Sequence, residues 1–262
     1  ISPLLLPHLR DRPLTLKRYP DGVAAGYFYE KQCPSHRPDW VQTAPVWSGH
    51  NQRTIDFCLV NDLPTLVWVA NLASLELHTA LHRAETLSRP DTVVFDLDPG
   101  EPAGIAACAE VALWLREALG GLGLAGAVAK ASGSKGMQVY APLNSDVTYE
   151  QTKSFARALA QVGERALPRL VVSNMSKDQR VGKVLIDWSQ NDEHKTTVCV
   201  YSLRARPSPA VSLPLRWPEV EATAGGEPLP ALEATPVLER VAAVGDLFAP
   251  LLEVAQPLPS FG

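Results

Sequence analysis

Cysteine is scarce in this sequence, and its four cysteines are isolated. Cys33, Cys58, Cys108 and Cys199 form no C-x-x-C pair and no cysteine–histidine group at the spacing of zinc ligands. This pattern argues against a structural zinc site. We therefore expect free thiols in a reducing compartment.

Long apolar runs are missing as well. No stretch of about 18 or more consecutive apolar residues occurs, and the first residues lack a cationic segment followed by a signal-type apolar stretch. The sequence therefore predicts no contact with a membrane and a cytoplasmic location.

The chain also has no excess of positive charge. Its 24 basic and 28 acidic residues give a formal net charge of −4, so no general attraction for nucleic acid is expected. Basic residues do cluster at Lys17-Arg18 and across 177–183, which would allow a local nucleic-acid surface. With 262 residues and 46% hydrophobic content, the chain can bury a large core in one large domain or two small ones.

The first 90 residues have mainly β patterns. Leu14 and Leu16 alternate with polar residues, and the turn at 20–22 precedes an aromatic run at 27–29, which predicts a hairpin. Apolar runs at 55–60 and 66–70 flank a turn and predict a second hairpin.

From residue 92 onward, strand and helix patterns alternate. The spacing predicts strands at 92–95, 126–130, 137–141 and 184–188, a helix over 104–119 and a second helix that begins at the Thr148-x-x-Gln151 capping box. The order strand, helix, strand, strand, helix, strand is that of the ferredoxin-like arrangement. Proline- and glycine-containing stretches at 207–214 and 223–230 predict loops or a peripheral tail.

Three aspartates end apolar strands. Asp96 and Asp98 share one face of their strand, about 7 Å apart at roughly 3.4 Å per residue, and Asp187 ends another such strand. Each could be an ordinary turn cap. Together they favour a metal site, because buried carboxylates need a partner and oxygen-only ligands select Mg²⁺ or Mn²⁺.

A glycine- and serine-rich loop lies between two predicted strands. In Ser132-Gly133-Ser134-Lys135-Gly136, backbone N–H groups and hydroxyls can approach a phosphate while the lysine supplies a positive charge. The spacing is not that of a Walker loop, and a simple glycine-rich hairpin is the alternative. Beside a metal site, the loop would act as a triphosphate clamp.

Six stretches together resemble the polymerase domain of bacterial end-joining DNA ligases, a branch of the archaeo-eukaryotic primase superfamily. They lie at 12–22, 71–78, 93–100, 132–143, 181–191 and 201–211. The resemblance implies an α+β primase-polymerase fold, with a βαββαβ ferredoxin/RRM-like catalytic module packed on a second, mainly β module. It implies one catalytic domain over 1–262, divided into a DNA- and nucleotide-contacting module at 1–90, the catalytic module at 91–205 and a C-terminal extension at 206–262.

The resemblance also implies a function. It predicts a DNA-templated nucleotidyltransferase that fills gaps or extends ends in non-homologous end joining, prefers ribonucleotides and uses two divalent cations, Mn²⁺ or Mg²⁺. It implies a bacterial cytoplasmic protein that joins the nucleoid during repair. Its expected partners are gapped, overhanging or primer–template DNA, ribo- or deoxynucleoside triphosphates and a separate DNA ligase.

The resemblance assigns roles to individual residues. Metal binding and catalysis fall to Asp96, Asp98 and Asp187. Nucleotide binding falls to Lys17, His78, Ser132, Ser134, Lys135, Gly136, Gln138, Gln190 and Arg204, and DNA binding to Arg18, Phe28, Tyr29 and Arg180.

The sequence departs from the family at two places. Gln138 stands where the family usually has histidine, so a neutral amide replaces an imidazole that can carry charge. The family also has a further amino-terminal segment whose lysines bind a downstream 5′-phosphate, and this sequence begins after most of it. The resemblance therefore does not extend to 5′-phosphate recognition.

Two other functions compete with polymerase activity. A haloacid-dehalogenase-like phosphatase also has D-x-D after an apolar strand, but its motif continues with Gly-Thr instead of Pro99-Gly100. A non-catalytic DNA-end-binding module would have no need for three mutually repelling carboxylates.

Overall fold

The computed structural model describes residues 1–49 and 51–259. The helices are α1 (Ser2–Leu9), α2 (Leu63–Asn71), α3 (Ile105–Gly121), α4 (Tyr149–Ala166), α5 (Trp217–Ala224), α6 (Ala234–Val244) and α7 (Pro250–Glu253), with 3₁₀ turns at Ala84–Thr86, Lys177–Gln179 and Trp188–Gln190. In this described part, no helix is both long and apolar enough to cross a membrane.

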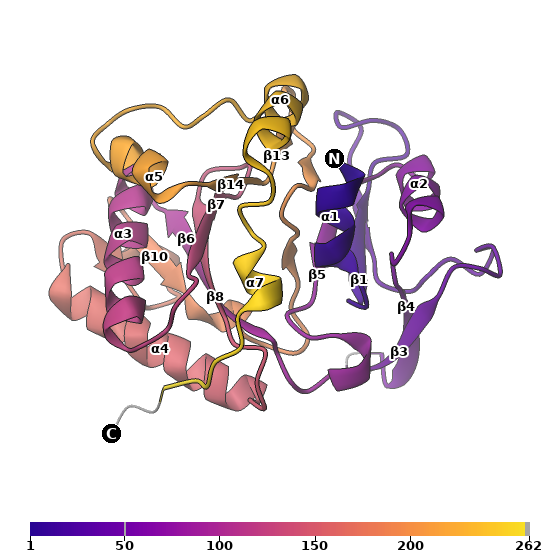
Figure 1. Ribbon diagram of the computed structural model, residues 1–262, viewed down its shortest axis with the longest axis horizontal. Helices are drawn as coiled ribbons and strands as arrows, with labels where there is room; N and C mark the ends of the chain where they lie inside the picture. Colours follow the sequence, from indigo (N-terminus) through magenta and orange to yellow (C-terminus); the bar gives the residue numbers. More distant parts are fainter. Residues whose placement is uncertain (50, 260–262) are drawn as a thin grey trace.

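The described strands form two large sheets that lie side by side (Figure 1). The first has the order β11-β5-β1-β4-β3, with β2 paired to β1, and the second has the order β14-β7-β8-β6-β10-β9. The first sheet contains β1 (Leu14–Arg18), β2 (Phe28–Glu30), β3 (Thr43–Ser48), β4 (Arg53–Cys58), β5 (Ser74–Thr79) and β11 (Thr197–Val198). The second contains β6 (Thr92–Pro99), β7 (Val128–Ala131), β8 (Met137–Pro142), β9 (Val171–Val172), β10 (Val184–Asp187) and β14 (Leu213–Leu215); β12 (Leu203–Arg204) pairs only with β13 (Ala210–Val211).

The second sheet confirms the predicted ferredoxin-like module and the α+β fold class. Its strands β7, β8, β6 and β10 are neighbours in that order, with every adjacent pair antiparallel. Helices α3 and α4 pack on one face of this sheet. The capping box that was expected at Thr148 is present, with the Thr148 side chain accepting from Gln151 N and the Gln151 side chain accepting from Thr148 N.

Strand β6 turns its two faces to different surroundings. Phe95 and Leu97 are fully buried in the core shared with the helices, whereas Val94 belongs to a second core that also contains Leu14 and Leu16 of the first sheet. Because side chains alternate along a strand, Asp96 lies on the Val94 face. Folding therefore turns that face of β6 toward the first sheet.

The first sheet confirms one predicted hairpin and contradicts the other. Strands β1 and β2 are antiparallel, with Lys17 opposite Tyr29. The run 66–70, expected to be a strand, lies in α2, and β4 pairs with β3, a strand that the sequence interpretation missed. Helix α2 forms because Asp62 caps it, accepting from Thr65 N at 2.8 Å, and Pro64 stands in its first turn, where a missing N–H costs nothing.

The prediction of free thiols is wrong for one pair of cysteines. Cys33 and Cys58 form a disulfide, whereas Cys108 and Cys199 are free and buried. The pair comes together because the Cys33 N–H donates to Asp56 O at 2.6 Å, which docks the segment after β2 onto β4 and leaves the two Cα atoms 5.0 Å apart. That separation lies within the range a disulfide requires.

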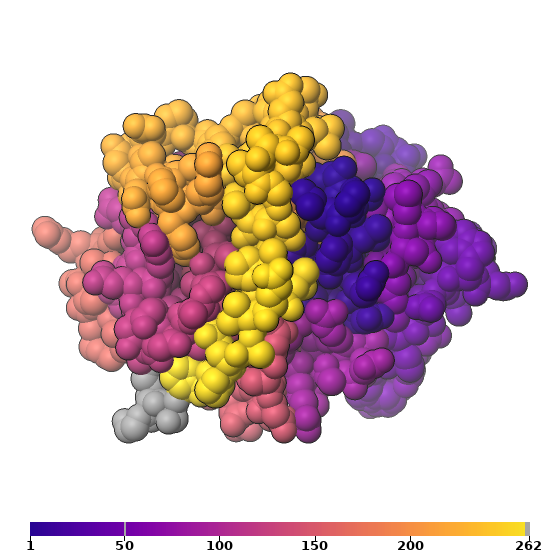
Figure 2. Space-filling model, in the orientation of Figure 1, coloured from indigo at the N-terminus to yellow at the C-terminus, as the bar shows by residue number. Residues whose placement is uncertain are grey.

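Of the two alternatives predicted for the stretches at 207–214 and 223–230, a loop does follow α5 at 225–233, but a peripheral tail is wrong. Strand β14 pairs with β7 at the edge of the second sheet, and α5 packs on α3. The last described segment then runs across the face shown in Figure 2, between the amino-terminal residues and the part of the chain that forms the second sheet and its helices. It is held there by hydrogen bonds from Asn144 Nδ2 to Leu251 O and Val254 O. These residues are therefore built into the body of the fold.

A buried asparagine attaches the segment after β10 to β6. Asn191 is fully buried, accepts from Val94 N at 3.0 Å and donates from Nδ2 to Val94 O at 2.7 Å. Strand β10 pairs with β6 only as far as Asp96. The Asn191 side chain thus continues this pairing by bonding to the β6 backbone at Val94.

We expect Asn191→Ala to lower the free energy of unfolding by about 2–3 kcal/mol, because it leaves buried polar groups without partners. Urea unfolding measures this loss. Asn174→Ala, which removes an exposed side chain bonded only to Ser176 N, should change stability by less than about 0.5 kcal/mol. Equal losses of stability in the two variants would show that the buried hydrogen bonds between Asn191 and Val94 do not stabilise the fold.

Candidate active site

A cavity of about 590 Å³ opens between the two sheets. It brings together eleven of the residues predicted from the sequence: Tyr29, His78, Asp96, Asp98, Ser132, Ser134, Lys135, Gly136, Gln138, Gln190 and Arg204. The other predicted residues, Lys17, Arg18, Phe28, Arg180 and Asp187, lie outside its described lining. The fold thus gathers residues from widely separated parts of the chain at one place.

A row of polar residues crosses the second sheet beneath this cavity. Asp187 on β10 lies directly opposite Asp96 on β6, which lies opposite Gln138 on β8, which lies opposite Lys130 on β7. Directly opposite residues of antiparallel strands have Cβ atoms about 4.5–5.5 Å apart. The two aspartates that the sequence placed on separate strands are therefore cross-strand neighbours.

Burial and neighbouring carboxylates raise the pKa values of Asp96 and Asp98. Burial and the charges of Asp98 and Asp187 raise the pKa of Asp96 to about 7, while a hydrogen bond from Gln138 opposes this rise. Burial and Asp187 likewise raise the pKa of Asp98, against the opposing charge of Arg180. Ionised together, the three carboxylates repel one another, and a bound cation would relieve that repulsion.

The donor chemistry of this row fits a divalent cation. Carboxylate oxygens are the ligands that Mg²⁺ and Mn²⁺ prefer. Across residues 1–49 and 51–259, no group of three or more His, Cys, Asp or Glu side chains is gathered closely enough to hold a metal ion. The metal site therefore stays a prediction, supported by the strand register and the type of ligand.

Asp187 is held by its own chain neighbours. Its Oδ1 accepts from Ser189 N at 2.9 Å and from Ser189 Oγ at 2.6 Å, and its Oδ2 accepts from Gln190 Nε2 at 3.2 Å. Lys195 donates in turn to Ser189 Oγ at 2.6 Å. Lys195 lines the cavity but was missed in the sequence, where it lies outside the two basic clusters that drew attention.

The loop at 132–136 has a closed, compact shape. Ser132 N donates to Gly136 O at 3.0 Å, and Ser134 N donates to Ser132 Oγ at 3.2 Å. Gly133 has a φ of +72°, and a Cβ on it would lie 2.6 Å from Arg204 Cγ, so the loop needs glycine here to pack against that arginine. Lys135 pairs with Glu101 at 3.2 Å, but both side chains are mostly exposed, so the lysine can exchange this partner at little cost.

Gln138 fits its place in the polar row. It is buried, and its Oε1 accepts a hydrogen bond from Tyr140 OH at 3.1 Å. Its amide also hydrogen-bonds Asp96 and favours the charged form of that carboxylate. An uncharged side chain can therefore take part in the row where the family usually has histidine.

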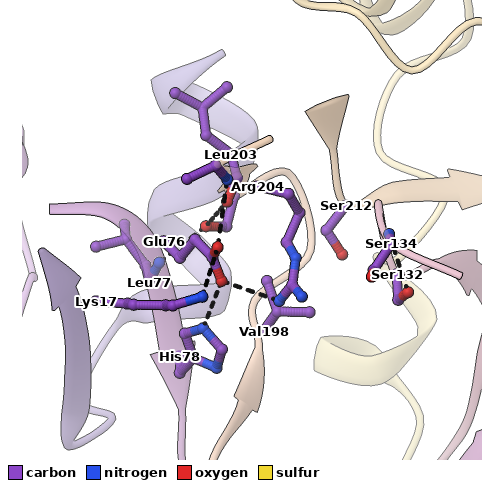
Figure 3. Close-up of polar contacts among 12 residues, drawn as sticks. Lys17, Glu76, Leu77, His78, Ser132, Ser134, Val198, Leu203, Arg204 and Ser212 are labelled. Carbon is purple, nitrogen blue, oxygen red and sulfur yellow. Dashed lines mark hydrogen bonds and ion pairs between the residues drawn. The ribbon is translucent and has the colours of Figure 1, made fainter. Parts of the chain in front are cut away.

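Glu76, which the sequence interpretation missed, is the centre of a polar cluster on the first sheet (Figure 3). Its side chain is only 2% exposed, and it lies 3.2 Å from Lys17 Nζ, 3.0 Å from His78 Nε2 and 3.0 Å from an Arg204 guanidinium nitrogen. Tyr19 OH and Ala205 N also donate to it, at 3.0 and 3.2 Å. The alternation Glu76-Leu77-His78 was the available signal, because it puts the glutamate on the face of the predicted histidine.

The surroundings of Glu76 keep its carboxyl ionised. Burial alone would raise its pKa, but the hydrogen bond from His78 and the charges of Arg204 and Lys17 lower it to about 2. Burial lowers the pKa of His78 despite this carboxylate, so its imidazole is neutral near pH 7.

Lys17 lies behind the cavity wall. Its ammonium contacts Glu76 and lies 3.9 Å from the centre of the Tyr27 ring. A cation over an aromatic face is attracted to the ring's π electrons. Lys17 thus connects the aromatic segment around β2 with the cluster on β5.

Of the predicted DNA-binding residues, Tyr29 lines the cavity, whereas Arg18, Phe28 and Arg180 lie outside its described lining. Phe28 and Tyr29 are 44% and 55% exposed, so they are not core residues. Arg18 pairs with Glu30 at 3.0 Å and lies over the Phe28 ring, while Arg180 donates to Met175 O at 2.7 Å. Further lining residues that the sequence did not single out are Thr15, Lys31, His194, Thr196, Thr197 and Val198, which carry no recognisable motif.

Comparison with known proteins agrees with this architecture. Residues 1–248 match the family of LigD primase-polymerase domains. The multifunctional non-homologous end joining protein LigD of Mycolicibacterium smegmatis is 40% identical over 253 residues, which are 96% of this chain and 32% of that protein. The bifunctional non-homologous end joining protein LigD of Bacillus subtilis is 33% identical over 224 residues, 85% of this chain and 35% of that protein.

A solved structure matches the whole fold. The polymerase domain of Mycobacterium tuberculosis ligase D, determined in complex with DNA, superposes with a TM-score of 0.88 at 38% identity, covering 97% of this chain and 89% of that one. The fold and the matches define a domain of the primase-polymerase class. The chain belongs to the LigD primase-polymerase family, which confirms the resemblance seen in the sequence. It spans about a third of the length of the LigD proteins it matches.

The pKa of Glu76 predicts how the domain responds to acid. Its folded value near 2 lies below the ordinary 4.5, so the ionised carboxylate stabilises the fold above pH 4.5, and this contribution is lost as the pH falls toward 2. We expect Glu76→Gln to lower the free energy of unfolding by an amount on the order of 3 kcal/mol at pH 6, and by clearly less at pH 3.

Urea unfolding of wild type and variant at both pH values tests this expectation. Glu239→Gln, at an exposed position on α6, should leave stability unchanged at either pH. A difference between wild type and Glu76→Gln that is the same at pH 3 and pH 6 would show that the carboxylate charge is not what stabilises the fold.

Proposed function

We propose that this domain is a DNA-templated nucleotidyltransferase that fills gaps or extends ends in double-strand break repair. The observation that carries the proposal is the position of Asp96 opposite Asp187 in the sheet beneath a cavity that also contains the 132–136 loop. Acidic ligands for cations and a phosphate-binding loop are the two parts that phosphoryl transfer requires.

Asp96, Asp98 and Asp187 would hold two divalent cations, Mn²⁺ or Mg²⁺. When bound, these cations would neutralise charge on the triphosphate and lower the pKa of the primer 3′-hydroxyl. Ser189 and Gln190 hold the Asp187 carboxylate in place through the hydrogen bonds described above. Asp187 would then help to activate that hydroxyl and take its proton as the hydroxyl oxygen bonds to the α-phosphorus and the bond to the departing pyrophosphate breaks.

The incoming nucleoside triphosphate would occupy the rest of the cavity. Ser132, Ser134 and Lys135 present hydroxyl and ammonium donors to its phosphates, and Gly136 lets the backbone approach closely. Arg204 supplies a guanidinium, which binds phosphate in a fork. The remaining contacts are assigned to Lys17, His78, Gln138 and Gln190, as the family resemblance implies.

The DNA would lie along the exposed aromatic strand. Phe28 and Tyr29 offer ring faces on which unpaired bases can stack, and Arg18 and Arg180 offer charge to backbone phosphates. The similar Mycobacterium tuberculosis domain was solved in complex with DNA, which supports DNA as the partner. We further propose a preference for ribonucleotides, a DNA ligase as functional partner and action at the nucleoid in the bacterial cytoplasm.

The two competing functions lack support. The family match at 40% identity is to end-joining proteins, whereas a phosphatase relationship rested on the D-x-D motif alone. A purely DNA-binding module would not explain why Asp96, Asp98 and Asp187 lie close enough that the charges of neighbouring aspartates raise the pKa of Asp96 and of Asp98.

Primer extension tests the proposed activity. We expect the wild-type domain to extend gapped and overhanging DNA only when Mn²⁺ or Mg²⁺ is present, and to add ribonucleotides faster than deoxynucleotides. Asp96→Asn should lower kcat by roughly 10³-fold or more, because it removes a cation ligand, yet it should fold normally. Asp146→Asn, at an exposed position paired with Arg89, is the matched control and should retain activity.

Phosphate-monoester hydrolysis without nucleotide addition would favour the phosphatase. Binding of gapped DNA without any addition in Mn²⁺ would favour the binding module.

We also expect Phe28→Ala to weaken binding to gapped DNA by roughly 5- to 100-fold, since stacking contributes about 1–3 kcal/mol per base. Fluorescence anisotropy at fixed salt measures the dissociation constant. Leu238→Ala, which removes another exposed apolar side chain on α6, should leave binding unchanged. Wild-type affinity in Phe28→Ala would exclude this strand as a stacking surface.

A further inference from the structure

We propose that Glu76 is a positioning residue, which holds Arg204, His78 and Lys17 in the geometry that binds the incoming nucleotide. The inference rests on the proposed function, because it assumes that the cavity takes a nucleoside triphosphate. Glu76 itself lies outside the described lining of that cavity, whereas His78 and Arg204 both line it. It would therefore act through its neighbours without touching the ligand.

The contacts of Glu76 join three separate parts of the chain. Lys17 lies on β1, directly opposite Glu76 on β5, while Arg204 comes from β12, far along the sequence. Each carboxylate oxygen has its own set of donors: Oε1 takes Lys17, Tyr19 and Ala205 N, and Oε2 takes His78 and Arg204. One buried anion thus sets the relative positions of groups that the backbone alone would leave independent.

A buried carboxylate is costly for a protein. Removing an ionised group from water carries a large free-energy penalty unless partners compensate for it. Glu76 is 2% exposed and is compensated by two cations and three further donors. A leucine would fill this place at lower cost if the fold alone mattered, so the arrangement points to a role for the ordered cations.

Glu76 also determines the tautomer of His78. An ionised carboxylate can only accept a hydrogen bond, so Nε2 of the neutral imidazole must carry the proton. Nδ1 is then left as an acceptor. His78 is therefore held in one orientation and one tautomer, and the positive charge in this part of the cavity comes from Arg204.

The charge of Glu76 has two opposing effects on nucleotide binding. It repels phosphate, but Lys17 and Arg204 largely neutralise it at contact distance. Without it, both long side chains would gain rotamer freedom, which nucleotide binding would have to remove again. The Arg204 guanidinium carries five N–H donors, more than its contact with one Glu76 oxygen can use, which leaves donors for phosphate. We therefore expect the ordering of Lys17 and Arg204 by Glu76 to favour nucleotide binding by more than the repulsion between Glu76 and the phosphates opposes it.

Steady-state kinetics of Glu76→Gln test the proposal. We expect KM for the nucleoside triphosphate to rise about tenfold, with kcat changed by less than about threefold and the dissociation constant for gapped DNA unchanged. A structural role alone would lower stability without this selective change in KM.

Glu219→Gln is the matched control. Glu219 also bridges two arginines, Arg216 and Arg240, and its side chain is 18% exposed, but it lies on α5, outside the described lining of the cavity. Its replacement should lower stability and leave KM unchanged. Equal increases of KM in both variants would show a general loss of stability and would overturn the proposal.

Combining substitutions tests whether Glu76 acts through Arg204. Because both removals disturb the same contact, Glu76→Gln and Arg204→Gln together should raise KM by less than the product of their separate effects. A fully multiplicative result would refute action through this arginine.

Two further outcomes would decide against the proposal. An unchanged KM, or a KM lowered by relief of repulsion, in a folded Glu76→Gln protein would overturn it. If that variant fails to fold, Tyr19→Phe removes one hydrogen bond to Glu76 and keeps the ring; we expect KM to rise about two- to threefold, and no rise would be a refutation. Wild-type protein that adds no nucleotide would instead refute the proposed function.

Discussion

The antiparallel pairing of β6 with β10 is the interaction on which the rest of the site depends. It puts Asp187 opposite Asp96, while pairing of β6 with β8 puts Gln138 on the other side of Asp96. A register shift of one residue would turn the carboxylates of β6 to the helix-covered face, where Phe95 and Leu97 are now buried. The hydrophobic core therefore holds the acidic row in place.

The cavity has two walls with different chemistry. The second sheet contributes the carboxylates and the 132–136 loop between β7 and β8. The first contributes Glu76, Lys17 and His78, which Arg204 joins from β12. The groups proposed to bind phosphate therefore come from more than one part of the fold. The last described segment crosses between the two parts (Figure 2) and packs Phe248 and Leu251 into the core that both sheets share. The spacing of the two sheets thus depends in part on Phe248 and Leu251, which are far along the sequence from the strands of the cavity walls.

Local signals in the sequence were reliable where short-range contacts decide structure. The capping box at Thr148, the β1–β2 hairpin and the order of elements around Asp96 all follow from side-chain periodicity and turn residues. The interpretation was wrong where a longer-range or capping interaction decided the outcome. The Asp62 cap turned an expected strand into α2, and docking of the Cys33 segment onto β4 formed a disulfide between cysteines that are far apart in sequence.

The sequence by itself determined the family, the acidic strand ends and the serine–glycine loop, because these are contiguous motifs whose chemistry is local. Only the tertiary structure revealed Glu76 as the centre of a cluster, since its partners Lys17 and Arg204 come from other strands. It also decided that Lys17 lies behind the cavity wall while Arg204 lines it. The physical reason is that burial and charge compensation depend on which strands become neighbours, and pairing over long sequence distances leaves no local pattern.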